Sequence, residues 1–362
     1  MKDIDVISEV KNLALPIFVW GMGAVGELVV KKLKENYIDV EGYVLDDKYI
    51  GENKGRADRD CKIISTSNVF MEYQSYVVFV GIHTFLGVDE EEIKKKFPGC
   101  VAVYSYSEIS DQVDRISMEY YEEKQDEFEM VYQALEDEFS KESFKAYINA
   151  KIEKDRTYLS PYVILPQYFF EQHLWKVTAD EVLLDGGAYN GDSIKDFLKL
   201  TDFKYKKIIA VEPDELNMKA LENYCKTDGL KNIKLLQKGL WSSADTLCFD
   251  SQGSMRTRIA EDGNSEVEVI NIDRIVSEID EPVSIIKMDI EGAEMMALYG
   301  AERTIKAYHP MLYISAYHKK DDLFKIYQYL VSLYPKYKFF FRCHKYLAID
   351  AVLYAIPPDR IY

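Results

Sequence analysis

The stretch VLLDGGAYNGDS, residues 182–193, decides the fold of the larger part of the chain. Its apolar run ends at Asp185, Gly186 and Gly187 follow, and Gly191 stands where a helix should open. Because glycine has no Cβ, the chain can pass close to a ligand at such a turn. The pattern predicts a strand, a turn that approaches a ligand, and a helix.

The next apolar run, IIAVEP at 208–213, ends in Glu212. An acidic side chain at this position can accept hydrogen bonds from both hydroxyls of a ribose. The spacing from Asp185 to Glu212 fits one helix and one return strand. Together the two features predict a ligand that contains adenosine, and any such ligand would satisfy them.

A third segment, SIIKMDIEGAEMMALYGA at 284–301, combines a strand, an acidic turn and a helix. With D-G-G-A-x-x-G-D and V-E-P, it resembles the FkbM family of S-adenosylmethionine-dependent methyltransferases. The I-K-x-D-x-E-G-A-E stretch of that family matches residues 286–294. The resemblance extends from about Tyr168 to Pro357, and it includes INIDRIV with Asp273, HPMLYISAYH and VLYAIP.

The resemblance implies a class I methyltransferase sheet of seven strands, completed by a terminal antiparallel hairpin, and methyl transfer to an oxygen. Glycans and other small hydroxylated molecules are the acceptors it implies. Gly186 stands where the family more often has Val, a change that leaves the cofactor site intact. The residues expected to bind S-adenosylmethionine are Asp185, Gly186, Gly187, Ala188, Gly191, Asp192, Glu212, Pro213 and Asp289.

Methyl transfer to a hydroxyl requires alignment of the acceptor and removal of its proton. We expect Asp289 to bind or deprotonate the acceptor, with Glu291 beside it in the substrate site. His318 ends the following strand and would converge on Asp289, and a histidine near its ordinary pKa suits a base. Three alternatives stay open. The two carboxylates would cap a helix, His318 would lie at the surface or behind the residues that contact the substrate, or all three would hold a divalent cation such as magnesium.

A second glycine turn lies near the N-terminus, in IFVWGMGAVG at 17–26, and a helical segment follows it. Asp46 and Asp47 come about twenty residues later, at the position expected to hold a ribose. One interpretation is an NAD-dependent oxidoreductase or a bifunctional chain, although no dehydrogenase catalytic set is evident. The region also resembles the small Rossmann-like domains of sugar acyltransferases and some sugar methyltransferases, which implies a nucleotide-sugar substrate. A module that only mediates dimerisation is the third interpretation. The expected substrate contacts here are Gly21, Gly23, Gly26 and Asp46.

Between the two glycine turns the composition becomes charged and aromatic. Phe128, Val131, Leu135 and Phe139 recur at three and four residues, which predicts one apolar helix face. The fold expected is therefore α/β with two Rossmann-like domains, at 1–117 and 168–362, joined by a helical connector at 118–167. The aromatic segment at 165–175, with Tyr168 and Phe169, would form either core packing, which we favour, or a lid.

Composition narrows the choice of partners. The formal net charge of -17 argues against nucleic acid, whose binding requires Lys and Arg to neutralise phosphates. A small-molecule or glycan acceptor is expected instead. Arg256 and Arg258 of SQGSMRTRI are candidate partners for any phosphate or carboxylate it carries, although we favour ordinary surface charge as their role. The five cysteines form no C-x-x-C pair, and no signal peptide or transmembrane run is evident, so a cytoplasmic protein is expected. A homo-oligomer is compatible with these features.

Overall fold

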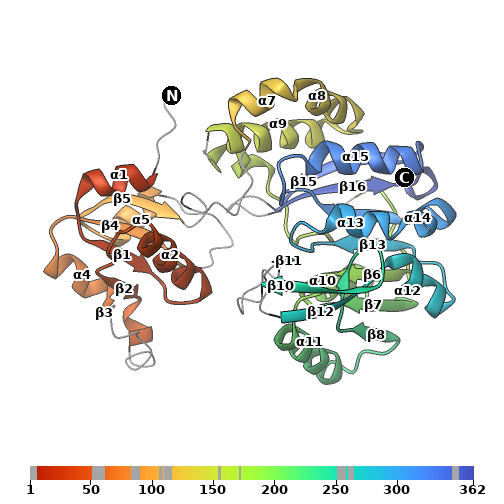
Figure 1. Cartoon of the computed structure of the whole chain (residues 1–362), viewed down its shortest axis with the longest axis horizontal. Coiled ribbons are helices and arrows are strands. Elements are labelled where there is room, and N and C mark those ends of the chain that lie inside the picture. Colours follow the sequence, from red (N-terminus) through yellow and green to blue (C-terminus); the bar gives the residue numbers. More distant parts are fainter. Residues whose placement is uncertain are drawn as a thin grey trace. The chain divides into compact units, whose positions relative to one another are not determined.

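The computed structural model describes residues 6–50, 62–82, 90–105, 109, 116–153, 156–170, 173–250, 258–259, 265–344 and 350–362 (Figure 1). Its contacts divide the chain into two compact units, the first within residues 1–113 and the second from residue 114 onward. Among the described residues, no helix is both long and apolar enough to cross a membrane. Arg256 lies outside the described residues.

The first unit is built on a five-stranded sheet, in the order β3-β2-β1-β4-β5, with all neighbouring strands parallel. The strands are β1 (Ile17–Trp20), β2 (Gly42–Leu45), β3 (Lys62–Ser65), β4 (Tyr76–Val80) and β5 (Cys100–Ser105). The helices are α1 (Val6–Leu13), α2 (Ala24–Glu35), α4 (Thr66–Glu72) and α5 (Glu90–Lys96), with a 3-10 turn at Asp47–Tyr49. Successive residues Phe18 and Val19 of β1 face different cores, so helices cover both faces. The strand-turn-helix predicted at 17–26 is present.

The second unit contains a seven-stranded sheet in the order β15-β16-β14-β13-β6-β7-β8 (Figure 1). The strands are β6 (Val182–Gly186), β7 (Lys207–Val211), β8 (Ile233–Leu236), β13 (Ile285–Met288), β14 (Met311–Ser315), β15 (Lys338–Cys343) and β16 (Ala351–Ile356). Strand β16 is antiparallel to both neighbours, whereas the other pairs are parallel. The seven-stranded α/β sheet with a terminal hairpin is therefore confirmed.

Helices pack on both faces of this sheet. They are α10 (Asp192–Leu200), α11 (Glu215–Thr227), α12 (Ile272–Ile279), α13 (Glu294–Tyr299), α14 (Glu302–Tyr308) and α15 (Asp322–Leu333). Apolar residues of α10 and α11 pack with the aromatic segment on one face, and those of α12 to α15 pack on the other. Tyr168, Phe169 and Trp175 of the aromatic segment are buried, so this segment forms core packing rather than a mobile lid.

A smaller sheet, which we did not expect from the sequence, has the order β11-β10-β12-β9. Its strands are β9 (Gly239–Leu240), β10 (Asp245–Asp250), β11 (Arg258–Ile259) and β12 (Ser265–Ile270). Arg258, which we expected in a loop, begins β11. Strands β9 and β11 have only two residues each, too few for a period-two signal, whereas SEVEVI of β12 carries such a signal that we did not use.

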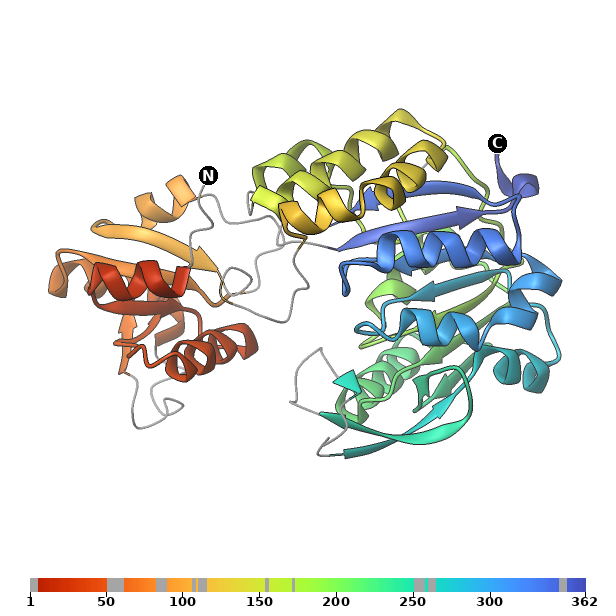
Figure 2. The same ribbon diagram turned by 45° about the horizontal axis from the view of Figure 1, so that its top comes forward.

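The charged segment after the first unit forms three helices, α7 (Met118–Glu123), α8 (Gln125–Ala134) and α9 (Glu138–Glu153). Figure 2 shows these yellow and green helices beside β15 and α15, and the buried side chains of Phe128 and Phe144 contact Phe324 and Phe341 there. The single helix face expected through Phe139 is wrong, because α8 ends at Ala134 and Phe139 belongs to the next helix. These helices are part of the core of the second unit.

Candidate functional site

The glycine loop follows β6 and is held against two neighbouring strands. The amides of Gly187 and Ala188 both donate to the carbonyl of Val211, at 2.9 and 3.1 Å. Gly187 has a φ of 71°, and a Cβ on this residue would overlap the carbonyl oxygen of Asp289. Glycine is thus required here for packing of the loop against the acidic turn, a reason that the sequence alone did not reveal.

Lys287 of β13 binds this loop through an ion pair and two hydrogen bonds. Its buried ammonium lies 3.0 Å from Asp185 Oδ1, and it donates to the carbonyls of Gly186 and Gly187 at 3.2 and 2.8 Å. Ser193 donates to the other oxygen of Asp185 at 2.6 Å. Burial disfavours the charged form of both partners. At Asp185 burial is the largest effect and raises the pKa. At Lys287 the negative charges of Asp185 and Asp289 outweigh burial, so the pKa of the ammonium is raised. We assigned Lys287 no role from the sequence, although the I-K-x-D motif was the available signal.

Glu212 lies at the end of β7 with its carboxylate almost fully buried. Its Oε2 accepts from the amide of Tyr189 at 2.9 Å, and its Oε1 accepts from the amide of Asp214 at 3.0 Å and from Asn217 at 3.3 Å. Burial raises the pKa of Glu212. These contacts fix the carboxylate beside the glycine loop, which is where a ribose-binding acid is expected. Pro213 follows Glu212 and is partly exposed.

Asp192 begins α10 and is exposed. Its carboxylate accepts from the amide of Ser193 at 2.8 Å, while Gly191 before it adopts a left-handed conformation with φ 88°. The carboxylate of Asp192 therefore satisfies one backbone amide in the first turn of the helix.

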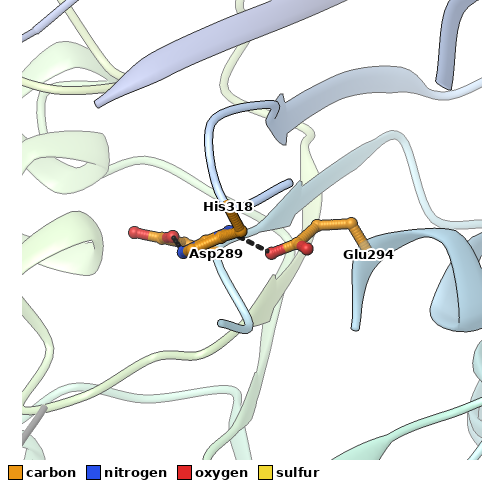
Figure 3. A group of neighbouring side chains, drawn as sticks. All are labelled: Asp289, Glu294 and His318. Carbon is orange, nitrogen blue, oxygen red and sulfur yellow. Dashed lines mark ion pairs between the residues drawn. The ribbon is translucent and has the colours of Figure 1, made fainter. Parts of the chain in front are cut away.

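The acidic turn after β13 and the end of β14 converge on one histidine (Figure 3). His318 is buried, and its Nε2 lies 3.5 Å from Asp289 Oδ1 and 3.7 Å from Glu291 Oε2. On the other side of the ring, Nδ1 lies 3.0 Å from Glu294 Oε1. Glu294 was absent from the residues that we selected by sequence, although it belongs to the matched motif.

Three carboxylates around one imidazole change its protonation. Burial by itself lowers the pKa of His318, but the charges of Glu294, Asp289 and Glu291 outweigh it and raise the pKa to about 9. The expectation that His318 titrates near its ordinary pKa is therefore wrong. In the absence of another cation the ring is an imidazolium at neutral pH, and it cannot accept a proton.

The alternative that Asp289 and Glu291 only cap a helix receives little support. Helix α13 begins at Glu294, and Ala293 at its N-cap has no capping side chain. The loop amide of Ile290 is bound by Glu294 Oε1 at 2.9 Å. The surface alternative for His318 is also wrong, because the ring is buried.

Two tyrosines complete the surroundings of Asp289. Tyr317 donates its hydroxyl to Asp289 Oδ1 at 3.0 Å. The buried hydroxyl of Tyr168 lies 2.8 Å from Ser315 Oγ, and the ammonium of Lys287 lies 5.1 Å from the centre of the Tyr168 ring. Sequence reasoning missed Tyr317, because only the end of β14 brings it to the acidic turn.

The glycine turn of the first unit is a separate feature. Gly21 and Gly26 pack tightly against each other, whereas a Cβ on Gly23 would meet open space. Asp46 at the end of β2 accepts from the indole of Trp20 at 3.2 Å and pairs with Lys96 at 2.8 Å. The ammonium of Lys96 also lies 4.4 Å from the centre of the Trp20 ring.

The order of the seven strands, the glycine loop after β6 and the acid after β7 together define a Rossmann-like methyltransferase fold. Residues 185–341 match the family model of the Methyltransferase FkbM domain. The resemblance expected from the motifs is thereby confirmed for the second unit.

One known structure supports the fold along almost the whole chain. Methyltransferase FkbM from Methylobacillus flagellatus KT is similar with a TM-score of 0.72 and 23% identity, over 97% of this chain and 93% of that chain. An rRNA methylase from Streptococcus thermophilus matches at a TM-score of 0.33 and 12% identity, over 49% of this chain and 87% of that chain. SMU.1697c from Streptococcus mutans, solved in complex with SAH, matches at a TM-score of 0.31 and 13% identity, over 56% and 96% of the two chains. No curated protein matches the chain.

Proposed function

We propose that the second unit transfers a methyl group from S-adenosylmethionine to a hydroxyl oxygen of a small acceptor, with sugars and glycans as the preferred class. The observation that carries the proposal is the contact between the acidic turn and the glycine loop. The amide of Asp289 donates to the carbonyl of Gly186 at 3.1 Å, so the carboxylate of Asp289 is held beside the loop expected to bind the cofactor. The FkbM domain match supports the same reaction.

The residues present fit the cofactor. Glu212 Oε2 accepts one hydrogen bond in the structure, and a carboxylate oxygen has two lone pairs, so it can also accept a ribose hydroxyl. In the glycine loop, the buried Asn190 Oδ1 has no hydrogen-bond partner among the described residues. A buried oxygen of this kind is normally satisfied, and the amino group of a bound cofactor is one donor that would satisfy it.

The proposed mechanism needs few protein groups. S-adenosylmethionine supplies an electrophilic methyl group when bound, so the protein must align the acceptor and take up its proton. We propose that Asp289, which is partly exposed, takes up the proton of the acceptor hydroxyl. Tyr317 would orient the Asp289 carboxylate through its hydrogen bond. His318 cannot serve as the base while it carries a proton, and instead it balances the charge of the carboxylates.

The test is a transfer assay with the purified chain, labelled S-adenosylmethionine, and a panel of nucleotide sugars and glycans. We expect binding of S-adenosylmethionine by calorimetry, and label on at least one hydroxylated acceptor. Failure of the chain to bind S-adenosylmethionine would overturn the proposal.

We further propose that the first unit holds the nucleotide part of the acceptor. Supporting this are the open space beside Gly23 and the position of Asp46 after β2, where Lys96 and Trp20 would meet a phosphate or a base. Calorimetry with nucleotide sugars should show binding that Asp46→Asn weakens and the surface variant Asp39→Asn does not. Binding of NADH with the same dependence would favour the oxidoreductase alternative, and binding of neither would leave a role in dimerisation.

A further inference from the structure

His318 lies between two carboxylates from different parts of the acidic turn (Figure 3). Asp289 faces Nε2 at 3.5 Å and Glu294 faces Nδ1 at 3.0 Å. One ligand atom from each of the three residues lies within 4.8 Å of the other two. Metal–oxygen and metal–nitrogen bonds are roughly 2.0–2.2 Å long, so two ligand atoms of one ion lie at most about 4.4 Å apart. A small movement of the side chains therefore allows all three to bind a single ion.

The buried atoms of this group lack the hydrogen bonds that a purely structural cluster would make. Both ring nitrogens of His318 and Glu294 Oε2 have no hydrogen-bond partner among the described residues. The approach of Nδ1 to Glu294 is close but is not aligned as a hydrogen bond. Buried polar atoms are rarely left unsatisfied, so an additional species is expected to contact them.

The charge around the ring points to a cation as that species. Glu291 also approaches Nε2 at 3.7 Å, and the buried carboxylate of Asp322 accepts from the amide of Lys319 at 2.8 Å nearby. Buried carboxylates such as those of Glu294 and Asp322 are stable only when their charge is compensated.

We propose that Asp289, Glu294 and His318 bind a divalent cation that accepts both nitrogen and oxygen ligands, of the class of Mn²⁺. Imidazole suits transition ions, and carboxylates suit Mg²⁺ and Mn²⁺, so Mn²⁺ accommodates the mixed set. Only one nitrogen of His318 can ligate one ion. Glu291 is not one of the three ligands and approaches Nε2, so it would fix the ring orientation when Nδ1 ligates the ion.

The catalytic role of the ion rests on the proposed methyl transfer, whereas binding of the ion does not. A divalent cation lowers the pKa of a hydroxyl beside it. The acceptor hydroxyl would lose its proton to a carboxylate of the cluster. Its oxygen would then form the bond to the methyl carbon as the carbon–sulfur bond breaks.

The experiment is a titration of the chelator-treated full chain with Mn²⁺ alone, followed by electron paramagnetic resonance. We expect one strong site per chain, with nitrogen coupling from a histidine ligand. Glu294→Gln and His318→Gln should weaken binding about tenfold or more, the effect typical of altered metal shells. His318→Gln should also abolish the nitrogen coupling. The exposed carboxylate variant Glu222→Gln should bind like the wild type.

A thermal melt of each variant shows whether the unit is folded, and affinity for S-adenosylmethionine is measured separately. The proposal is overturned if the folded wild type binds no stoichiometric Mn²⁺, or if the two variants bind it as well as the control does. Ion binding without any S-adenosylmethionine binding would instead overturn the proposed function and leave the ion site standing. Methyl transfer that persists in chelator would remove the catalytic role of the ion alone.

Discussion

At the scale of single residues, Asp289 combines two roles that can be separated. Its backbone amide holds the glycine loop, and its carboxylate meets Tyr317 and His318. Asp289→Asn removes only the second role, so we expect turnover to fall about 100-fold or more, as for loss of a general base. Affinity for S-adenosylmethionine should stay within about threefold of the wild type, because the backbone hydrogen bond that holds the glycine loop is preserved. A threefold change corresponds to roughly 0.7 kcal/mol of binding free energy. Initial rates and calorimetry measure the two quantities.

The control for this variant is Asp202→Asn, at an exposed carboxylate that pairs with Lys204 at 2.8 Å. It should leave both quantities unchanged. Near-wild-type turnover in Asp289→Asn would show that Asp289 neither takes up the proton nor holds an ion needed for transfer.

Glu212 allows a test of the cofactor site that requires no acceptor. Glu212→Gln keeps the size of the side chain but removes its charge, and hydrogen bonds to charged groups contribute about 1.5–3 kcal/mol. We therefore expect affinity for S-adenosylmethionine to fall roughly 10- to 150-fold. Calorimetry measures this loss, and a thermal melt checks that the unit stays folded. Unchanged affinity would place the ribose elsewhere.

At the scale of elements, β13 is joined to β6 by a buried ion pair as well as by backbone hydrogen bonds. Lys287 and Asp185 are register partners, and their charges lie 3.0 Å apart. Lys287→Met would leave Asp185 buried without a compensating charge, which costs about 3–5 kcal/mol. We expect the free energy of unfolding in urea to fall by that amount.

A second substitution separates the lost ion pair from lost packing. In Lys287→Met with Asp185→Leu, no buried charge is left, and replacement of a buried pair by apolar side chains is often neutral. The double variant should therefore be more stable than Lys287→Met, although it should not bind S-adenosylmethionine. A double variant that is less stable than the single one would contradict this account of the ion pair.

The same elements show what the sequence could predict. Apolar runs that end in glycine or acid were sufficient for β6, β7 and β13, and two neighbouring apolar runs were sufficient for the terminal hairpin, because those signals are local. The environment of His318 was not predictable, since its pKa depends on three carboxylates that a separate loop brings to it. The roles of Lys287 and Tyr317 were not predictable for the same reason. Their partners lie on neighbouring strands or loops rather than nearby in the sequence.

At the scale of the whole molecule, the two units have separate cores, and the helices α7 to α9 belong to the second. Arg342 of β15 is buried and pairs with Asp137 at 2.6 Å, next to the start of α9. From the sequence we had treated residues 118–167 as a connector. The charged face of these helices was visible there, but the partner of their apolar face, on β15, was not.

This packing predicts where the chain can be divided. A fragment that begins at Ile116 keeps the three helices, so it should fold cooperatively and bind S-adenosylmethionine like the full chain. A fragment that begins at Tyr168 loses Phe128, Phe144 and Tyr147, each of which contributes about 1.5–3 kcal/mol when buried. It also leaves Arg342 without Asp137. These losses approach the roughly 5–15 kcal/mol that holds a domain folded, so the shorter fragment should be largely unfolded. Circular dichroism melts of both fragments measure the difference. A shorter fragment that melts like the longer one would show that the helices are dispensable.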